Sequence, residues 1–447
     1  MGVTKELTTF LLETQFEDFP KEVVVRGKEL IIDFLGGALG GSQTRVSNIL
    51  TEYAREKNSI PEAVVIGKNL KATAAYASYL NGIFNHSTEL ESVSQRTSPN
   101  PLAAIAVSLA VGEKLGCSGK ETLEGFILGF EIQGRIGGSS LAGVSKKGRI
   151  SIFNHLGAAA AASKLMKLDL NQARMALGIV AFQAGGLIAN VGTMAHVLEL
   201  AVAGRDGIEA AELAARGVTS HPDIIETPQG FCDALIEERG YDLKKMTKDL
   251  GKSFQVFDPG ISIKKYPCCY RSHRALDALF DLMAEHRLCY NDIEKVTVDL
   301  NLYDSYLMKF PNPETGEEAK FSYPHILGAA ILKGKVWLDS FTDESMSDEK
   351  YREARKKVDV VIHQEWPPGR VDARTPVTIR LKDGREFSKE VNLPREPNLA
   401  QLLDRYREAA SGILKRDQTE KSIDLLLTLE KVKDVSEIMS LLAPQTR

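Results

Sequence analysis

The sequence predicts a mainly α protein, in which a large all-helical domain built from both chain ends carries an inserted, smaller α+β lid domain. Three observations support this fold class. Apolar residues recur at three- and four-residue spacing through the first half of the chain, alternate with polar residues in the second half, and return to helical spacing at the end. A chain of 447 residues also exceeds what one hydrophobic core usually serves, so at least two domains are expected.

The first half of the chain is expected to form consecutive helices from Lys5 to about Ile236. Two of these helices, at 156–168 and 173–190, are crowded with Ala and Gly. Small residues let helix axes approach closely, so both segments are predicted to be inner helices of a bundle. The Gly-rich stretch at 34–44 lacks the Lys and Ser/Thr of a phosphate-binding loop and follows a helical pattern, so it is interpreted as a helix end.

Strands are expected in the segment that follows. Residues 293–303 alternate between apolar and polar up to Leu302, which indicates a strand with one buried face. Residues 358–366 form a second candidate, and residues 375–391 contain two alternating runs around an Asp-Gly pair, a strong hairpin signal. Helical segments lie between these strands, so this part of the chain is predicted to be an α+β domain.

The predicted domain boundaries lie where this pattern changes. The main helical domain is expected to span 1–258, and the α+β lid domain 259–396. Helical periodicity resumes after Pro394 and Pro397, and the helices of 397–447 are expected to pack back on the first domain. A cleft between two such domains is the usual place for a functional site.

The composition argues against several classes of function. A formal net charge of −4 provides no concentrated basic face for nucleic acid, and no apolar run reaches the roughly 20 residues that a membrane span needs. The N-terminus lacks the pattern of an export signal, so a cytoplasmic location is expected. The five cysteines show neither a disulfide pattern nor zinc-ligand spacing, and no metal or other cofactor is predicted.

Four polar clusters interrupt the apolar pattern, at 81–101, 145–160, 189–204 and 262–279. Their cationic side chains could hold carboxylates through charge-assisted hydrogen bonds, while a Glu or His beside them could move a proton near neutral pH. The predicted acid–base residues are Glu89, His155 and His196, with Glu89 paired with either His196 or His155. The predicted substrate-binding residues are His86, Arg149, Lys264, Lys265, Tyr270, Arg271 and His273. Together they would suit proton abstraction next to a carboxylate, a reaction that needs no cofactor.

Structural roles remain open for several polar residues of these clusters. A single histidine on a helix, such as His86 or His196, is more often hydrogen-bonded within the fold than catalytic. The lysine pair at 146–147 fits a solvated loop. The adjacent cysteines at 268–269 fit small buried side chains, so the anion-holding role in that segment is assigned to its cations.

Four segments, in order, resemble the MmgE/PrpD family over most of the chain. "NGIFNHSTELES" resembles the family's "NG…AHALDFDD" segment, and "LGAAAAASKLMKL" resembles its "GAAAAAAKLLGL". The segment that begins "GTMAHVLELAVAG" and ends "PDIIETPQGF" is similar to "GTMTKPLHAG…PDILEGPRGF", and "IKKYPCCYRSHRALDA" is similar to "KRYPCCGHTHPAIDA". The resemblance implies a large helical domain with a smaller α+β lid, in a protein expected to be a homodimer.

Departures from the family pattern affect the expected site. Glu89 stands where the family has an aspartate, and His196 stands where it has an active-site lysine. Ser98 and Gly148 fall where the family has histidines, while His155 replaces a small residue. The resemblance alone therefore transfers neither the dehydratase nor the decarboxylase activity of family members to this chain.

The expected function is that of a cofactor-independent isomerase or epimerase, or of a lyase, that removes a proton next to a carboxylate of a small di- or tricarboxylate. The lid segment, with its Lys-Lys pair and "EAKFS" run, resembles the epimerases of the family and favours the first option. Two alternatives remain open: a hydro-lyase similar to 2-methylcitrate dehydratase, and a catalytically impaired family member that binds a carboxylate or scaffolds a dimer.

Overall fold

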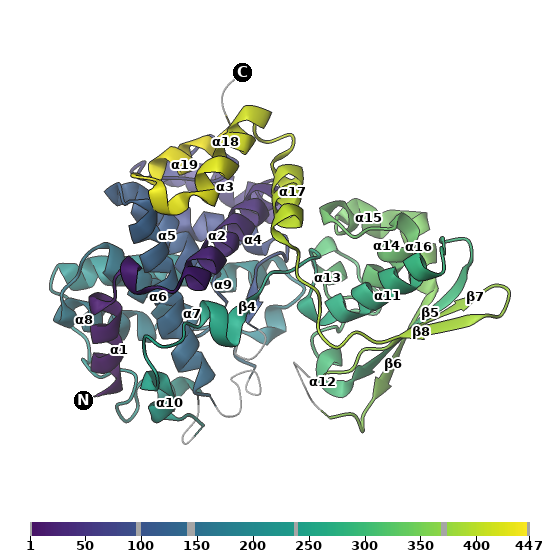
Figure 1. The fold of residues 1–447 in the computed structure, drawn as a ribbon, viewed down its shortest axis with the longest axis horizontal. Helices are drawn as coiled ribbons and strands as arrows, with labels where there is room; N and C mark the ends of the chain where they lie inside the picture. Colours follow the sequence, from purple (N-terminus) through teal and green to yellow (C-terminus); the bar gives the residue numbers. More distant parts are fainter. Residues whose placement is uncertain (1, 95–99, 141–147, 237–239, 368–372, 445–447) are drawn as a thin grey trace. The chain divides into compact units, whose positions relative to one another are not determined.

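The structure, a computed structural model, describes residues 2–94, 100–140, 148–236, 240–367 and 373–444. Helices account for most of its regular structure, which confirms the predicted mainly α fold. Figure 1 shows the elements in the colours of the sequence. The chain divides into two compact units: unit 1 contains Met1–Ala189, Ala195–Ile263 and Asn398–Arg447, and unit 2 contains Asn190–Met194 and Lys264–Pro397. No helix in the described ranges combines the length and apolar character that crossing a membrane requires.

Unit 1 is helical. Its N-terminal helices are α1 (Val3–Glu13), α2 (Lys21–Gly41), α3 (Arg45–Lys57), α4 (Ala74–His86), α5 (Leu102–Leu115), α6 (Gly119–Gly138), α7 (Asn154–Leu165), α8 (Leu170–Ala181), α9 (Met194–Ala215) and α10 (Leu243–Thr247). Its C-terminal helices are α17 (Leu399–Ala410), α18 (Arg416–Leu427) and α19 (Ser436–Leu441). Two short antiparallel ladders pair β1 (Ala63–Val64) with β2 (Lys71–Ala72) and β3 (Val93–Ser94) with β4 (Ile261–Ser262).

Small residues bring α4 into close contact with α2 and α9. A Cβ atom added to Gly41 of α2 would lie 1.7 Å from the carbonyl oxygen of Phe84 in α4, and one added to Gly82 of α4 would lie 3.0 Å from Cβ of Ala201 in α9. Larger side chains would not fit at these crossings without moving a helix. The Gly-rich stretch is therefore the end of α2, as predicted, and its glycines set how closely α4 approaches its neighbours.

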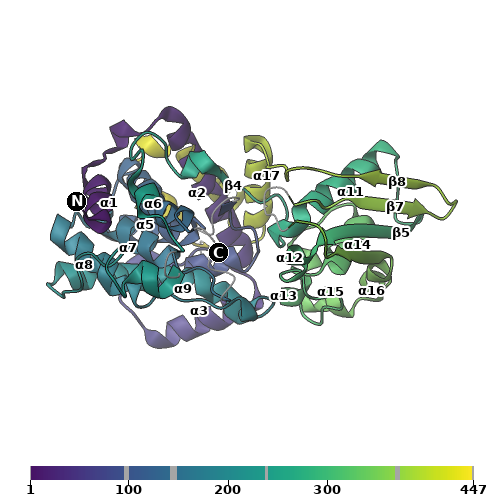
Figure 2. The ribbon, with the colours of Figure 1, turned by 90° about the horizontal axis from the view of Figure 1, so that it is seen from below.

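The C-terminal helix α17 packs on α2. Arg405 of α17 pairs with the buried carboxylate of Asp33 in α2, and the hydroxyl group of Ser92 donates to the same carboxylate at 2.5 Å. Figures 1 and 2 show α17 beside α2 in both views. A buried carboxylate needs a cation or hydrogen-bond donors to replace its lost hydration, and Arg405 and Ser92 supply both.

Two inner helices were predicted from their Ala and Gly content, and one of them is shorter than expected. In α7, residues 158–162 are fully buried, as an inner helix requires. The pattern predicted the second helix over 173–190, but α8 ends at Ala181. Beyond it, Phe182 is 80% exposed and Gly186 has a φ of 142°, a backbone conformation that suits glycine and does not continue a helix.

Unit 2 is built around a four-stranded sheet with the order β6-β5-β7-β8. Its strands are β5 (Ile293–Asn301), β6 (Val358–His363), β7 (Val377–Leu381) and β8 (Glu386–Lys389). β5 pairs parallel with β6 and antiparallel with β7, and β7 forms the predicted hairpin with β8. Its helices are α11 (His273–Glu285), α12 (Leu302–Ser305), α13 (Gly316–Ala319), α14 (Tyr323–Lys333), α15 (Asp343–Ser347) and α16 (Glu349–Lys356).

The two-residue period predicted β5 correctly except at its end. Val296, Val298 and Leu300 belong to the hydrophobic core of unit 2. Leu302, which was predicted to continue the strand, begins α12 and is 37% exposed. The side chain of Asn301 accepts a hydrogen bond from a backbone N–H in that turn at 2.8 Å, and this helix cap ends the strand.

Acid is expected to destabilise unit 2 through His325 of α14. Its Nε2 donates to the carbonyl oxygen of Ser340 at 2.6 Å, and its Nδ1 accepts from Arg355 at 3.1 Å, so the neutral ring is satisfied. Burial lowers the pKa of His325 to about 4, and the charge of Arg355 adds to this effect. An unfolded histidine has a pKa of about 6.5, so the unfolded chain binds more protons between these two values, and stability falls as the pH drops through this window.

The expected loss is about 3 kcal/mol between about pH 7 and pH 4, because one pKa unit corresponds to about 1.4 kcal/mol. Urea unfolding of the full chain across this pH range, followed by a probe in unit 2, measures it. In His325→Gln, which cannot titrate, the slope of unfolding free energy against pH should be smaller. An identical slope in both proteins would contradict the assignment.

Candidate active site

Two histidines and two glutamates from α4 and α9 meet inside unit 1. His86 is the last residue of α4, and Glu89 follows in a turn with a φ of 55°. His196 and Glu199 lie one turn apart near the start of α9. Residues three apart on a helix share a face, so α9 presents a histidine and a glutamate together, and the turn after α4 does the same. These four residues are called the His-Glu cluster below.

The His-Glu cluster is compact and buried. The Nε2 atoms of His86 and His196 lie 3.5 Å and 3.8 Å from Oε1 of Glu89. The two imidazole rings contact each other edge to face, with their centroids 4.8 Å apart. The exposed fractions are 1% for His86, 3% for Glu89, 7% for His196 and 9% for Glu199. Little water therefore reaches these groups, and their electrostatic interactions are stronger than they would be at the surface.

Contacts on the far side of each ring indicate where its hydrogen lies. Nδ1 of His86 is 3.2 Å from the carbonyl oxygen of Val197, which can only accept, so Nδ1 carries the hydrogen. Nδ1 of His196 faces Oε2 of Glu199 at 3.5 Å, and the other oxygen of Glu199 accepts from the N–H of Leu187 at 2.9 Å. In the neutral ring of His86, Nε2 is therefore the nitrogen without hydrogen, and it faces Glu89.

His155, also predicted to be an acid–base residue, lies in a separate buried pair. It is in the first turn of α7, and its Nε2 lies 3.5 Å from Oδ2 of Asp206 in α9. Burial alone would raise the pKa of Asp206, but hydrogen bonding from His155 and Arg205 outweighs burial and lowers that pKa. Within the described residues, no hydrogen bond or ion pair joins His155 to Glu89. The structure therefore separates His155 from Glu89, whereas His196 lies beside Glu89.

Arg149 is held by backbone carbonyl groups. Its Nη1 donates to the carbonyl oxygens of Ala234 at 2.9 Å and Leu235 at 2.7 Å. These contacts tie the residue to the helical turn Cys232–Ile236. One guanidinium nitrogen is therefore already occupied, and carboxylate binding by Arg149 stays a prediction. The lysine pair at 146–147 lies outside the described residues, as does Ser98.

In unit 2, two cations of the predicted anion-holding segment are paired with carboxylates. Arg271 donates to Oδ1 of Asp304 at 2.5 Å, and Nζ of Lys265 lies 3.2 Å from Oδ1 of Asp277. Lys264 is 1% exposed. These carboxylates reduce the positive charge that the segment can offer to an anion. Anion binding by Lys264, Lys265 and Arg271 stays a prediction.

His273 is part of the protein interior. Its Nε2 donates to the carbonyl oxygen of Cys268 at 3.3 Å. Burial lowers the pKa of His273 to about 3, and the charge of Lys264 lowers it further, so the ring is neutral at physiological pH. It can offer a hydrogen bond but no positive charge. Tyr270 starts the short helical turn Tyr270–Ser272 that precedes His273. Both adjacent cysteines are buried and reduced, as predicted.

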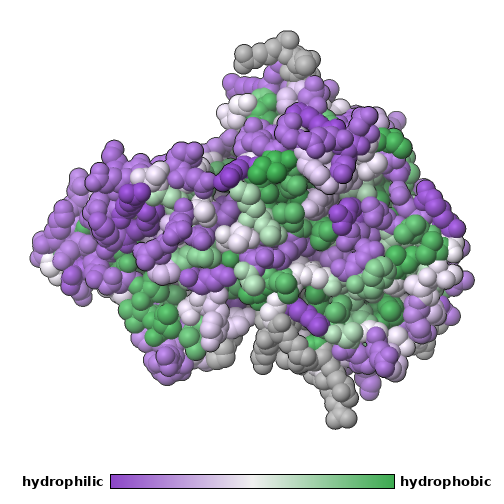
Figure 3. All heavy atoms as spheres, turned by 180° about the vertical axis from the view of Figure 1, so that it is seen from behind, coloured by the Kyte–Doolittle hydropathy of each residue, from purple (hydrophilic) through white to green (hydrophobic). Residues whose placement is uncertain are grey.

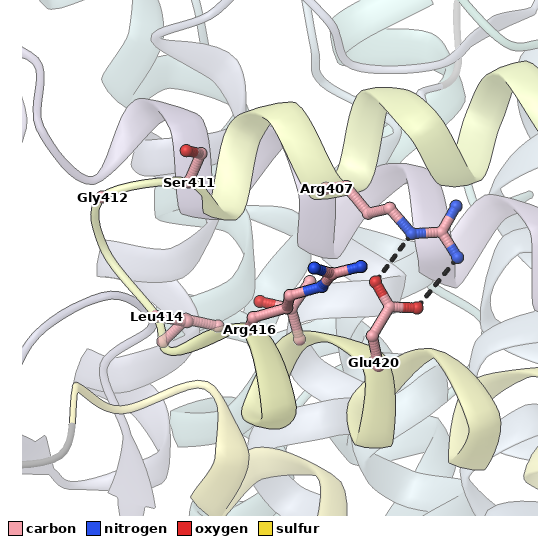
Figure 4. Close-up of a pocket in the computed structure, with 7 residues that line it drawn as sticks. Arg407, Ser411, Gly412, Leu414, Arg416 and Glu420 are labelled. Carbon is pink, nitrogen blue, oxygen red and sulfur yellow. Dashed lines mark hydrogen bonds and ion pairs between the residues drawn. The ribbon is translucent and has the colours of Figure 1, made fainter.

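A surface hollow of about 660 Å³ lies between α17 and α18, and its lining shares no residue with the His-Glu cluster. In Figure 4, the guanidinium group of Arg407 faces Glu420 across this hollow, with two hydrogen bonds of 2.8 Å and 2.9 Å. The positive charge of Arg407 is therefore balanced within the hollow. On the face drawn in Figure 3, polar side chains separate the apolar patches. None of the residues predicted from the sequence to bind or act on a substrate lines this hollow.

Comparison with known proteins identifies the family. Residues 5–244 match the MmgE/PrpD N-terminal domain, and residues 266–431 match the MmgE/PrpD C-terminal domain. The chain belongs to the MmgE/PrpD family. The resemblance seen in the four sequence segments is thereby confirmed.

This MmgE/PrpD protein is similar over nearly its whole length to cis-aconitate decarboxylases. It is 28% identical to the enzyme of Mus musculus, over 94% of this chain and 89% of the relative. It is 27% identical to the enzyme of Homo sapiens, over 99% of this chain and 94% of the relative. A cis-aconitate decarboxylase-like protein of Aspergillus oryzae is 26% identical, over 99% of this chain and 97% of the relative. A decarboxylase is a lyase, so the comparisons support a lyase-type family.

Several partners of the candidate residues were not predicted. Asp206 and Asp304 fix the surroundings of His155 and Arg271, yet each lies tens of residues away in sequence. No local pattern in an MmgE/PrpD sequence would have indicated these pairings. Glu199 did carry a signal, because it follows His196 by three residues on a helix.

Proposed function

We propose that this protein removes and returns a proton on a carbon next to a carboxylate of a small di- or tricarboxylate, with the His-Glu cluster as its acid–base machinery. The proposal rests on one observation: two imidazole Nε2 atoms approach a single buried carboxylate oxygen, Oε1 of Glu89. Proton transfer to carbon acids is efficient when acid and base groups are fixed close together with little water present. The cluster provides such groups without a cofactor.

Glu89 is the proposed base. Its carboxylate would take the proton as the C–H bond breaks, and the electron pair would move onto the adjacent substrate carboxylate. His196 would return a proton from Nε2, which lies 3.8 Å from the same oxygen of Glu89. Glu199, 3.5 Å from Nδ1 of His196, would orient that ring, as a carboxylate beside a catalytic histidine does. His86 would hold Glu89 in place from the other side.

The fate of the electron pair decides the product. A proton returned to the opposite face of the same carbon gives an epimer, and one returned to another carbon gives an isomer. Expulsion of a group beta to the carbanion gives a lyase product. The decarboxylase relatives favour the lyase outcome. In a decarboxylation, the C–C bond to a carboxylate would break, CO2 would leave, and the cluster would protonate the remaining carbanion.

A second candidate for the proton donor is His155, in its buried pair with Asp206. Because the pKa of Asp206 is lowered despite its burial, this carboxylate stays ionised beside His155. In this alternative His155, whose Nε2 lies 3.5 Å from Oδ2 of Asp206, is the general acid. His155 would then act on a substrate in place of His196, with Asp206 as its positioning residue.

Proton NMR in deuterated water tests the proposal. Purified protein would be incubated with a panel of small di- and tricarboxylates, and loss of the signal from hydrogens next to a carboxylate would be followed over time. Exchange at such a carbon supports carbanion chemistry, and the products separate the outcomes: inverted stereochemistry for an epimerase, and CO2 or an alkene for a lyase. Substrate incubated with heat-denatured protein controls for uncatalysed exchange.

Silence across the panel would contradict the proposed enzyme. If one acid then raised the melting temperature without being converted, the protein would be a carboxylate-binding member of the family instead, because a ligand that binds only the folded state stabilises it. The same melting assay would test the predicted carboxylate-binding residues, including Arg149, Lys264, Lys265 and Arg271, by charge-removing variants.

A further inference from the structure

Three electron-pair donors converge where α4 ends and α9 begins. Oε1 of Glu89 lies 3.5 Å from Nε2 of His86 and 3.8 Å from Nε2 of His196. One ligand atom from each residue lies within 4.8 Å of the other two. In a tetrahedral zinc site with bonds of about 2.0 to 2.1 Å, neighbouring ligand atoms lie roughly 3.3 Å apart. The observed separations are wider than this spacing, so a bound ion would have to draw the three atoms together.

The outer contacts of both rings have the form found around metal ligands. A metal-binding histidine usually donates its other ring N–H to a backbone carbonyl or a carboxylate, which fixes the tautomer and turns the remaining lone pair toward the ion. Nδ1 of His86 has the carbonyl oxygen of Val197 at 3.2 Å. Nδ1 of His196 has Oε2 of Glu199 at 3.5 Å, and Leu187 anchors that carboxylate. Nε2 of His86 is therefore oriented as a ligand, and Glu199 lies beside the outer nitrogen of His196.

The charge of the cluster also suits a cation. Glu89 and Glu199 place two carboxylates in an environment where their exposed fractions are 3% and 9%. Burying ionised carboxylates is costly unless positive charge balances them. A divalent ion bound by Glu89 and two neutral imidazoles, with Glu199 in the outer layer, would add positive charge beside these two carboxylates.

We propose that His86, Glu89 and His196 form a binding site for a divalent first-row transition-metal ion. Two imidazole nitrogens and one carboxylate oxygen suit Zn²⁺ or Fe²⁺, and a set of three protein ligands leaves a coordination position open. Ca²⁺ and Mg²⁺ prefer shells made of oxygen, so the two imidazoles discriminate against them. Two of the three ligands, Glu89 and His196, stand where the family pattern has an aspartate and a lysine, so the site is a property of this chain's own residues.

A bound metal would compete with the proposed reaction. The ion would occupy the lone pairs that Glu89 and His196 need for proton transfer, since metal ligands must be deprotonated and stay engaged with the ion. The metal-loaded protein is therefore expected to be inactive in proton exchange. This consequence depends on the proposed function, whereas metal binding itself does not.

Cobalt and zinc titrations test the site directly. The full-length protein would be freed of metal with a chelator and titrated with Co²⁺, whose visible absorption becomes intense in a site of four or five ligands. We expect saturation at one Co²⁺ per chain and displacement by Zn²⁺. Glu89→Gln and His196→Lys each remove one ligand and should weaken Zn²⁺ binding by at least about 100-fold, while Glu199→Gln should weaken it by about 10- to 100-fold.

His155→Gln is the matched control, because it removes a buried histidine of unit 1 that lies outside the three proposed ligands. Its metal binding should equal that of the unaltered protein. Thermal melts of each metal-free variant distinguish loss of a ligand from loss of the fold. The proposed metal site would be overturned if the unaltered protein gave no Co²⁺ spectrum that saturates at one ion per chain. It would also be overturned if folded Glu89→Gln and His196→Lys bound metal as tightly as the unaltered protein.

The activity of the same samples separates the two proposals. If the metal-free protein catalyses proton exchange and added Zn²⁺ stops it, both the metal site and the proposed function are supported. If metal binds, the metal-free protein is inactive, and Zn²⁺ restores exchange, then the site stands and proton transfer by Glu89 is wrong. Exchange by a protein that binds no metal overturns the site and leaves the proposed function in place.

Discussion

Replacing Glu89 by Gln is expected to lower the rate of proton exchange on the substrate by roughly 10²- to 10⁴-fold. Gln keeps the size of the side chain and removes the carboxylate that would take the proton. His196→Ala should cause a loss of similar size, because its Nε2 would supply the returning proton. Both rates would be measured by NMR with the acid that the unaltered protein converts.

The double variant gives a sharper test. When two side chains act as one unit, the rate losses from replacing them are not additive. The double variant Glu89→Gln/His196→Ala should therefore exchange protons only slightly more slowly than either single variant. Independent roles would instead multiply the two losses. His221→Ala, which changes an exposed histidine of unit 1, serves as the control and should exchange at the unaltered rate. An unchanged rate in His196→Ala would remove His196 from the mechanism.

The largest loss of stability is expected from Arg135→Met. Arg135 of α6 donates to Oε1 of Glu131 at 2.5 Å and to the carbonyl oxygen of Lys248 at 2.6 Å. Glu131 is fully buried, and its second oxygen accepts from the N–H of Gln255 at 2.5 Å. Burial raises the pKa of Glu131 although Arg135 opposes this effect. Removing the guanidinium would leave this carboxyl group buried without its cation, at a cost of about 3 to 5 kcal/mol.

Urea unfolding at neutral pH measures this effect as a shift of the midpoint. Glu131→Gln combined with Arg135→Met should recover much of the loss, because no uncompensated charge then remains. Arg407→Met provides the matched surface control. Its pair with Glu420 is solvent-exposed, and exposed pairs contribute little, so the midpoint should hardly change. Equal shifts in Arg135→Met and Arg407→Met would contradict the argument.

Local patterns predicted much of the fold. The two-residue period identified the strands of unit 2 because burial on one face imposes that period on the sequence. The same pattern failed at Leu302, where the cap formed by Asn301 overrode it. Helical spacing likewise placed the end of α8 too late. Apolar residues continue the pattern after Ala181, but the backbone at Gly186 is not helical.

The candidate site was predictable only in parts. Each half of the His-Glu cluster has a histidine and a glutamate three residues apart, which the sequence displays. The approach of the two halves depends on the crossing of α4 and α9 at Gly82 and Ala201, and helical spacing does not specify which helices cross. Sequence reasoning therefore paired Glu89 with either His196 or His155, and the tertiary structure brings His196 close to Glu89.

The backbone at Glu89 has a consequence for how this protein could change over time. Its φ of 55° is a conformation that glycine and asparagine adopt readily and that glutamate adopts at a cost of about 1 kcal/mol or more. Selection for thermal robustness alone would therefore replace this residue, while selection for chemistry would retain it. With Glu89 as the proposed base, a glutamate at position 89 would exchange some durability of the fold for catalysis.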